Sequence, residues 1–168
     1  MPTINGKACV INGVPVDKVF SNGRQVYGRN LLTGTSSDLK TKQLTNMYNT
    51  GAQATNGSFK IKVFKGQTYT YRVWLDNTQG TDKAFVNIGF LPTTEGTIDY
   101  SISNGVRIDK GETGYSTSTF TLSEDGYLLL TPFAYGAPET ALVGWKEEKL
   151  EIGNTPTPWT PAPEDVLK

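Results

Sequence analysis

The sequence predicts an all-β protein, a two-sheet sandwich or barrel preceded by a small N-terminal β-meander. Short runs of alternating apolar and polar residues recur along the chain, separated by turn residues and without helical intervals. The 18 glycines, 9 prolines and many Thr, Asn, Tyr and Val residues match the composition of strands and turns. At 168 residues, the chain has the length of one ordinary domain with a small appendage.

The meander is predicted over residues 1–28. Its apolar runs are separated by three Asn-Gly pairs, and Asn-Gly tolerates the positive φ angles of tight hairpin turns. Pro15 indicates that its strand lies at a sheet edge or begins at that residue. A meander this short has little core of its own, so we interpret it as an attachment element. The pairs are 5–6, 12–13 and 22–23, and the predicted strands are 7–11, 14–20 and 24–27.

The main domain is predicted over residues 29–168. Its first segment, residues 33–57, is polar and rich in Thr, Ser, Asn and Gly, which indicates a loop with a short strand near Met47. Residues 59–63 and 68–76 then alternate cleanly on either side of a Lys-Gly-Gln turn, a pattern typical of a hairpin. The remaining predicted strands are 84–91, 98–102, 106–108, 118–122, 127–135 and 140–152.

Prolines mark the end of the domain. Four of them between positions 156 and 163 remove backbone donors and fix φ, so this tail cannot pair as a central strand. Trp159, which lies between two of these prolines, is expected to dock the tail onto the domain. Pro132, inside a predicted strand, is expected to bend that strand or to place it at a sheet edge.

Composition excludes several partners. The 16 basic and 16 acidic residues are interspersed and give zero formal charge, so no broad basic face is available for a nucleic-acid backbone. No apolar run approaches the roughly 18 residues of a membrane span, and the N-terminus lacks a secretory signal, so we expect no membrane partner. Cys9, the single cysteine, forms no intrachain disulfide and is expected to pack as a small apolar residue.

The sequence also argues against catalysis. It contains no histidine, which removes the usual general base, the usual partner of a nucleophilic Ser or Cys, and the commonest zinc ligand. A glycosidase needs only two carboxylates. However, the candidates fall in turns or strands that we expect to be exposed, as solvated charges: Glu124, Asp125, Glu147, Glu148 and Glu151. No phosphate-binding loop or acidic calcium loop is present, so we expect no enzymatic activity and no cofactor.

Short segments of the chain carry a resemblance to known proteins. The main domain contains, in order, NLL (30–32), YRVWL (71–75), GYLLL (126–130) and KLEIG (149–153). Their order and spacing resemble the carbohydrate-binding jelly-roll modules related to xylan- and glucan-binding families. The N-terminal block INGKACVINGVPVDKVFSNGRQVYGRNLL and the closing KLEIG and WTPAPED resemble tail and baseplate proteins of phages that infect Lactobacillus-type Gram-positive bacteria.

This resemblance implies a jelly-roll β-sandwich of two antiparallel sheets that serves as a non-catalytic module of a virion, at the tail tip or baseplate. Its partners would be a host cell-surface polysaccharide and other tail or baseplate proteins. Because single sugar contacts are weak, we also expect a homo-oligomer, such as a trimer, that residues 1–28 help to assemble. Related modules often carry a structural calcium ion held partly by backbone carbonyls, to which the sequence assigns no residues.

A glycan site needs an aromatic plate for a sugar ring and fixed polar groups for its hydroxyls. If the apolar residues of the strand at 68–76 face the core, alternation turns the residues between them outward. The same argument turns residues 85 and 87 outward, and in related modules an outward sheet face holds the ligand. The candidate carbohydrate-binding residues are Arg72, Trp74, Asp76, Asn87, Tyr135 and, as a weaker candidate, Trp145.

Several alternatives remain open at this point. Trp74 could instead fill the core or lie under a loop, and for Phe133 this is the favoured interpretation. Trp145 lies among charges and is either a second sugar-stacking residue or a lid over the sandwich edge. The alternatives to glycan recognition are a purely structural tail or baseplate component and an appended module of a cell-wall hydrolase.

Overall fold

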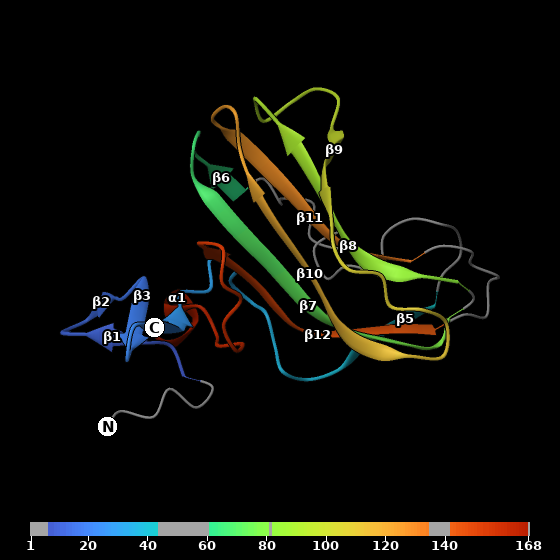
Figure 1. Ribbon diagram of the computed structural model, residues 1–168, viewed down its shortest axis with the longest axis horizontal. Coiled ribbons are helices and arrows are strands. Elements are labelled where there is room, and N and C mark those ends of the chain that lie inside the picture. The colour runs from blue at the N-terminus through green and yellow to red at the C-terminus, as the bar shows by residue number, and fades with distance from the viewer. Residues whose placement is uncertain (1–6, 44–60, 81, 135–141, 168) are drawn as a thin grey trace.

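The computed structural model describes residues 7–43, 61–80, 82–134 and 142–167. Two four-stranded sheets pack face to face, two short hairpins precede them, and the described tail ends in one helical turn (Figure 1). The elements are β1 (Val10–Ile11), β2 (Val14–Pro15), β3 (Lys18–Ser21), β4 (Arg24–Gly28), β5 (Lys40–Gln43), β6 (Ile61–Val63), β7 (Thr68–Gln79), β8 (Ala84–Leu91), β9 (Asp99–Asn104), β10 (Thr113–Thr121), β11 (Gly126–Ala134), β12 (Leu142–Ile152) and α1 (Pro163–Val166).

Both sheets of the sandwich are antiparallel. The β7 sheet has the order β10-β7-β12-β5, and the β8 sheet has the order β6-β11-β8-β9. In each sheet, a strand from the start of the sandwich lies beside one from its end, β5 beside β12 and β6 beside β11. The prediction of an all-β sandwich of two antiparallel sheets is confirmed, and its assignment as a jelly roll stays a prediction.

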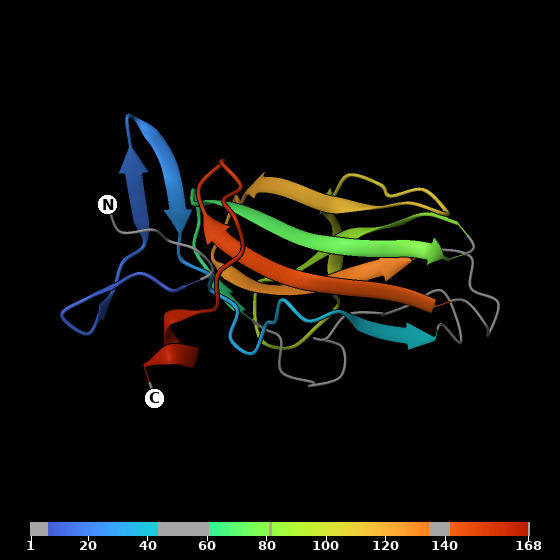
Figure 2. The ribbon, with the colours of Figure 1, turned by 90° about the horizontal axis from the view of Figure 1, so that it is seen from below.

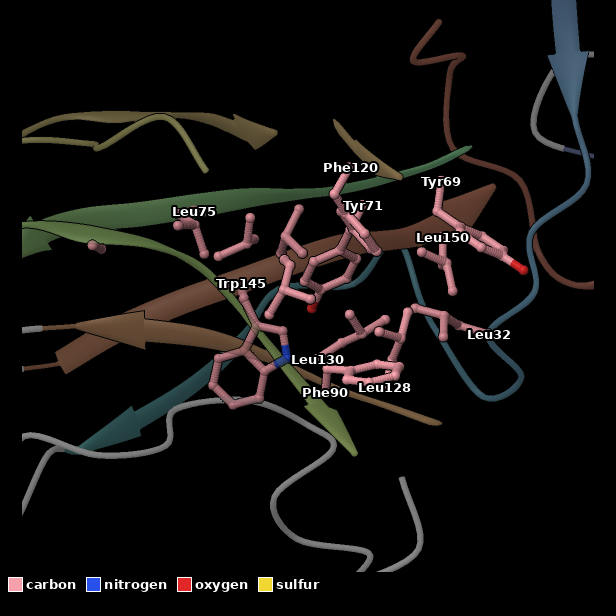
Figure 3. Close-up of a cluster of buried hydrophobic side chains, with 14 of the residues drawn as sticks. Leu32, Tyr69, Tyr71, Leu75, Phe90, Phe120, Leu128, Leu130, Trp145 and Leu150 are labelled. Carbon is pink, nitrogen blue, oxygen red and sulfur yellow. The ribbon is translucent and has the colours of Figure 1, made fainter. Parts of the chain in front are cut away.

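The core lies between the two sheets. Along β7, the inward side chains are at most 2% exposed: Tyr69, Tyr71, Val73 and Leu75. They face apolar side chains of the β8 sheet, of which Figure 3 labels Phe90, Leu128 and Leu130. Burying a side chain of this size contributes about 1.5–3 kcal/mol, so the paired inner faces hold the sandwich together. The predicted inward faces of β7 and β8 are confirmed.

The predicted hairpin between residues 59–63 and 68–76 is wrong. β6 pairs with β11 in the β8 sheet, whereas β7 pairs with β10 and β12 in the other sheet. The turn itself is present, since Gly66 has a φ of 73° and the Gln67 N–H donates to the Phe64 carbonyl at 3.2 Å. It carries the chain from one sheet to the other. Alternation predicts which side of a strand is buried but not which strand becomes its neighbour, and residues 59 and 60 lie outside the described residues.

The N-terminal segment forms two separate hairpins, β1 with β2 and β3 with β4, rather than one three-stranded meander. The Asn-Gly pairs at 12–13 and 22–23 turn both hairpins with φ angles between 50° and 78°, as type I′ turns require. The run predicted at 14–20 is split, because β2 ends at Pro15 and β3 begins at Lys18. The pair at 5–6 lies outside the described residues.

Other strands differ in extent. The strand predicted at 118–122 begins earlier, since β10 starts at Thr113. Residues 106–108 form only an isolated bridge between Ile108 and Ala84. Pro132 lies in β11, whose pairing with β6 stops at Leu128. Pro132 itself pairs with Val86 of β8. The short strand near Met47 lies outside the described residues.

The C-terminal tail and the N-terminal hairpins meet at one end of the sandwich (Figures 1 and 2). Trp159 donates from Nε1 to the Thr35 hydroxyl at 3.1 Å, which confirms the prediction that it docks the tail. Arg29, which directly follows β4, forms ion pairs with Asp17 of the hairpin segment and with Glu164 of α1. The N-terminal hairpins and the C-terminal tail therefore contact each other, and the tail also contacts the segment before β5.

Asn30 connects three parts of the chain through one buried amide. Its side chain is fully buried, at 0% exposure, so each polar atom needs a partner inside the protein. The amide nitrogen donates to the Thr35 hydroxyl and to the Glu148 and Thr160 carbonyls, each at 3.1 Å. The amide oxygen accepts from the backbone N–H groups of Leu32 and Leu150 at 3.1 and 3.2 Å. Asn30 therefore joins the segment after β4, strand β12 and the tail.

Replacing this amide should destabilise the whole fold. We expect Asn30→Ala to lower the free energy of unfolding by about 3–5 kcal/mol, because it leaves several buried backbone groups without partners. Urea denaturation followed by tryptophan fluorescence measures the change. Asn104→Ala, which removes an exposed side chain from β9, is the control and should cost less than about 1 kcal/mol. Equal costs for the two variants would contradict the central role of Asn30.

Candidate functional site

Three of the predicted site residues lie together on the outer face of the β7 sheet. Arg72, Trp74 and Asp76 alternate with the buried residues of β7 and are each partly exposed. The predicted outward direction of these side chains is confirmed. Trp74 therefore lies on the outer face of the sheet. The alternative that it fills the core between the sheets is wrong.

A β-bulge in β12 shapes this face. Lys146 is opposite Trp74 and Lys149 is opposite Arg72. Between these two pairs β12 therefore advances by three residues while β7 advances by two, so β12 contains one extra residue. Glu147, at the bulge, has a φ of 55°, and its N–H donates to the Ser36 carbonyl at 2.8 Å. An extra residue in one strand shifts the alternation beyond it. As a result, Lys146 and Glu147 both reach the outer face.

Two aromatic rings, two cations and one carboxylate lie together on the outer face, and we call this group the aromatic strip: Trp74, Tyr115, Arg72, Lys146 and Glu147. Trp74 and Tyr115 are directly opposite each other on β7 and β10. The Lys146 ammonium lies 4.6 Å from the centroid of the Trp74 ring, and the Arg72 guanidinium carbon lies 3.5 Å from the centroid of the Tyr115 ring. Each of these cation–π contacts contributes about 0.5–1 kcal/mol at an exposed site.

Tyr115 links β10 to the bulge of β12 through its hydroxyl group. Its hydroxyl donates to the Glu147 carboxylate, and its ring is 38% exposed. Burial raises the pKa of Tyr115, and the hydrogen bond and negative charge of Glu147 raise it further, against the opposing effect of Arg72. The phenol thus stays protonated at neutral pH and remains a hydrogen-bond donor.

Tyr115 was not among the predicted site residues, because its strand was predicted to begin at residue 118, whereas β10 begins at Thr113. The alternation of residues in this strand is a weak signal for its outward side. Residues 115, 117, 119 and 121 are one tyrosine and three threonines, alternating with Ser116, Ser118 and Phe120, which are buried. Extending the alternation backwards from Phe120 would have placed Tyr115 outward.

Two of the remaining predicted site residues, Asn87 and Trp145, do not join the aromatic strip. Asn87 lies on the outer face of the β8 sheet, on the opposite side of the sandwich, where its amide donates to Asn104 at 2.7 Å. Tyr135 lies outside the described residues. Trp145 is only 6% exposed and packs in the core (Figure 3). Because its indole is buried between the sheets, a sugar ring cannot stack on it.

Phe133 is neither a core residue nor part of the strip. It is partly exposed on the outer face of the β8 sheet, where its ring lies 5.2 Å from the Phe85 ring. Phe85 also receives the guanidinium of Arg107 at 5.6 Å. Of the favoured interpretation, that Phe133 fills the core or lies under a loop, the core part is therefore wrong, because alternation along β11 turns Phe133 away from Leu128 and Leu130; the loop part stays a prediction.

Two carboxylates expected to be solvated are buried instead. Glu148 and Glu151 are 3% and 1% exposed. The bulge turns Glu148 inward, where the Tyr71 hydroxyl donates to it at 2.6 Å. Glu151 accepts from the Thr157 N–H and hydroxyl, both at 2.7 Å. The expectation failed because each carboxylate has a buried polar partner, Tyr71 from another strand for Glu148 and Thr157 from the tail that folds back onto β12 for Glu151.

Lys149 completes a buried network beneath the tail. Its ammonium donates to the Thr157 hydroxyl at 2.7 Å and to the Pro158 carbonyl at 2.8 Å, and lies 3.8 Å from Glu151. Burial lowers the pKa of Lys149 to about 8, although Glu151 raises it. The network fixes the proline-rich tail against the outer side of β12. It also requires Gly28, since a Cβ there would lie 1.8 Å from the Glu151 carboxylate.

Other features of the described residues offer no competing site. They contain no group of three or more His, Cys, Asp or Glu side chains that could hold a metal ion, and none of their helices is long and apolar enough to cross a membrane. A pocket of about 240 Å³ lies between β4 and the tail, lined by residues 24–26 and 155–158, none of them aromatic. The aromatic strip is therefore the best candidate site.

Comparison with known proteins adds no family. No protein-family model matches the chain, and no curated protein matches its sequence.

Buried Glu148 should make stability depend on pH. Burial raises its pKa from 4.5 to about 7, while the Tyr71 hydrogen bond and the charge of Lys40 lower it. The pKa of this carboxyl is higher in the folded state than in the unfolded state, so its contribution to the stability of the folded state is fully present below pH 4.5. This contribution is lost as the pH rises through about 7. We expect the unfolding free energy of the parent, relative to Glu148→Gln, to fall by about 3 kcal/mol across this range.

Chemical denaturation at several pH values measures this difference. The amide of Glu148→Gln can still accept from Tyr71 but does not titrate, so it removes only the pH dependence. Glu124→Gln, in an exposed turn, is the control and should keep the slope of the parent. A parent and a Glu148→Gln variant with parallel pH profiles would contradict the expectation.

Proposed function

We propose that this protein is a non-catalytic glycan-binding module that serves in a virion, at the tail tip or baseplate of a phage, and recognises a host cell-wall polysaccharide. The observation that carries the proposal is the pair of aromatic residues Trp74 and Tyr115, which are neighbours across β7 and β10 on the outer face of the β7 sheet. The resemblance of the segments NLL, YRVWL, GYLLL and KLEIG to carbohydrate-binding jelly-roll modules supports it.

The aromatic strip has both components that sugar recognition needs. The rings offer apolar surface to the C–H faces of a sugar, and the charged and hydroxyl groups beside them can bond its hydroxyls. Each such hydrogen bond replaces one to water and contributes only about 0.5–1.5 kcal/mol. A single strip would therefore bind weakly. Several copies on one particle would raise the avidity about 10²- to 10⁴-fold without any new contact.

A purely structural role in the tail or baseplate is the second candidate. It is favoured by the apolar surface of the N-terminal hairpins, where Ile11, Val14 and Phe20 are between 60% and 64% exposed. Hairpins this short have little core of their own, so such side chains are typical of an attachment surface. A glycan-binding module held in a multimer would use the same surface. Glycan binding itself therefore distinguishes the two candidates.

The first test removes the larger ring. We expect Trp74→Ala to weaken binding to cell-wall polysaccharide from lactobacilli about tenfold or more, because a buried aromatic contact contributes about 1.5–3 kcal/mol. Isothermal titration calorimetry on a panel of such polysaccharides measures it. Phe64→Ala is the matched control, since Phe64 is 53% exposed at the turn after β6, outside the strip, and should bind like the parent. If the parent binds none of the panel, the structural role is favoured.

The second test addresses assembly. We expect the full-length chain to form a homo-oligomer and the combined variant Ile11→Ser, Val14→Ser and Phe20→Ser to shift towards a monomer, because it removes apolar surface that association would bury. Light scattering measures both masses, and circular dichroism shows whether the variant is folded. A monomeric parent, or an unchanged mass for a folded variant, would contradict an assembly role of the hairpins.

A further inference from the structure

Arg72 is a partly buried cation without a carboxylate partner. Its guanidinium stacks on Tyr115, interacts with the Tyr115 hydroxyl, and donates from Nη1 to the Thr157 carbonyl over a long 3.4 Å. No ion pair joins it to any carboxylate in the part of the chain that the structure describes. A guanidinium has five N–H donors in a planar fork suited to carboxylate and phosphate. Within the described residues, most of the donor capacity of Arg72 is therefore unused.

Lys146 is a second cation of the strip with few hydrogen-bond partners, and it lies against the ring of Trp74. Its ammonium stacks on Trp74, and its nearest carboxylate oxygen is that of Glu147 at 4.0 Å, which is too long for a hydrogen bond. The two aromatic rings of the strip thus each carry a cation whose hydrogen bonds to the protein are few or absent within the described residues.

The acidic groups of this face are already engaged. Glu147 accepts from the Tyr115 hydroxyl. Asp76 accepts from the Thr78 N–H at 3.0 Å and from the Thr78 hydroxyl at 2.6 Å. The neighbouring cation Lys149 is matched by Glu151 and by the tail. The strip therefore offers a ligand unused cationic donors, whereas its carboxylates have partners.

A stacked cation also favours charged over neutral sugars. A sugar that packs on Trp74 must share or displace Lys146, and displacement loses the cation–π contact between the ammonium and the ring. A neutral sugar offers nothing equivalent in return. An anionic substituent that pairs with the displaced ammonium offsets this cost with a charge-assisted hydrogen bond, which is stronger than a neutral one.

We propose that the aromatic strip selects saccharides that carry an anionic substituent, a phosphate or a carboxylate, which accepts from Arg72 and Lys146 while the sugar ring lies against Trp74 and Tyr115. This inference rests on the proposed glycan-binding function and specifies the chemical class of its ligand. Arg72 and Lys146 determine this selectivity, and the two rings provide the surface for stacking.

The experiment separates cell-wall polysaccharide of lactobacilli by anion exchange into a neutral, a phosphate-containing and a uronate-containing fraction. Binding of the full-length chain to each fraction is measured by calorimetry at low and high NaCl. We expect at least one anionic fraction to bind about tenfold more tightly than the neutral one, and this preference to shrink at high salt because ions screen exposed charges. The fraction that binds identifies phosphate or carboxylate as the source of the charge.

Three variants assign the effect to residues. Arg72→Gln and Lys146→Gln should each weaken binding to the anionic fraction about tenfold and leave binding to the neutral fraction within about twofold, because one charge-assisted contact is lost. Arg107→Gln is the matched control, since Arg107 also stacks on an aromatic ring but on the β8 sheet, and should bind like the parent. Circular dichroism confirms the fold of each variant.

The outcomes separate the two proposals. Equal binding of neutral and anionic fractions, or equal effects of the Arg72→Gln and Arg107→Gln variants, would overturn the selectivity while leaving glycan binding in place. No binding of any fraction by the parent would overturn the glycan-binding function itself, and the selectivity with it.

Discussion

The β-bulge in β12 is the constraint on which the rest of the structure depends. It turns Glu148 into the core beside Tyr71 and lets Lys146 and Glu147 reach the outer face together. The left-handed φ of 55° at Glu147 costs about 1–3 kcal/mol for a residue other than glycine. Surrounding contacts offset this cost, since Asn30 bonds the Glu148 carbonyl and the Leu150 N–H on the far side of the bulge.

The same bulge links the surface to the ends of the chain. Beyond it, Lys149 and Glu151 point outward but are covered by the tail, where Thr157 satisfies both of them. Thr157 also accepts from the Gly28 N–H at 3.1 Å, at the end of β4, and its carbonyl accepts from Arg72. The N-terminal hairpins, the tail and the aromatic strip therefore share one polar junction.

The candidate site could be predicted only where strands are regular. Alternation along β7 correctly turned Arg72, Trp74 and Asp76 outward, because no bulge interrupts the register of β7 with β10. Alternation could not show that Asn87 belongs to the opposite sheet. Nor could it show that Trp145 packs in the core between the two sheets. The partners of Trp74 come from β10 and β12, far away in sequence, so Tyr115 and Lys146 were found only through the strand pairings.

The sequence by itself determined the all-β class, the two Asn-Gly turns, the inward faces of β7 and β8, and the absence of a strand in the described part of the proline-rich tail. These are local properties, since each follows from the φ angles a residue tolerates or from the two-residue period of a strand. Tertiary structure decided which strands pair, why residues 61–63 and 68–76 belong to different sheets, and that Glu148 and Glu151 are buried. Such features depend on how the chain folds back on itself, because a charge can be buried only where folding brings a matching group to it.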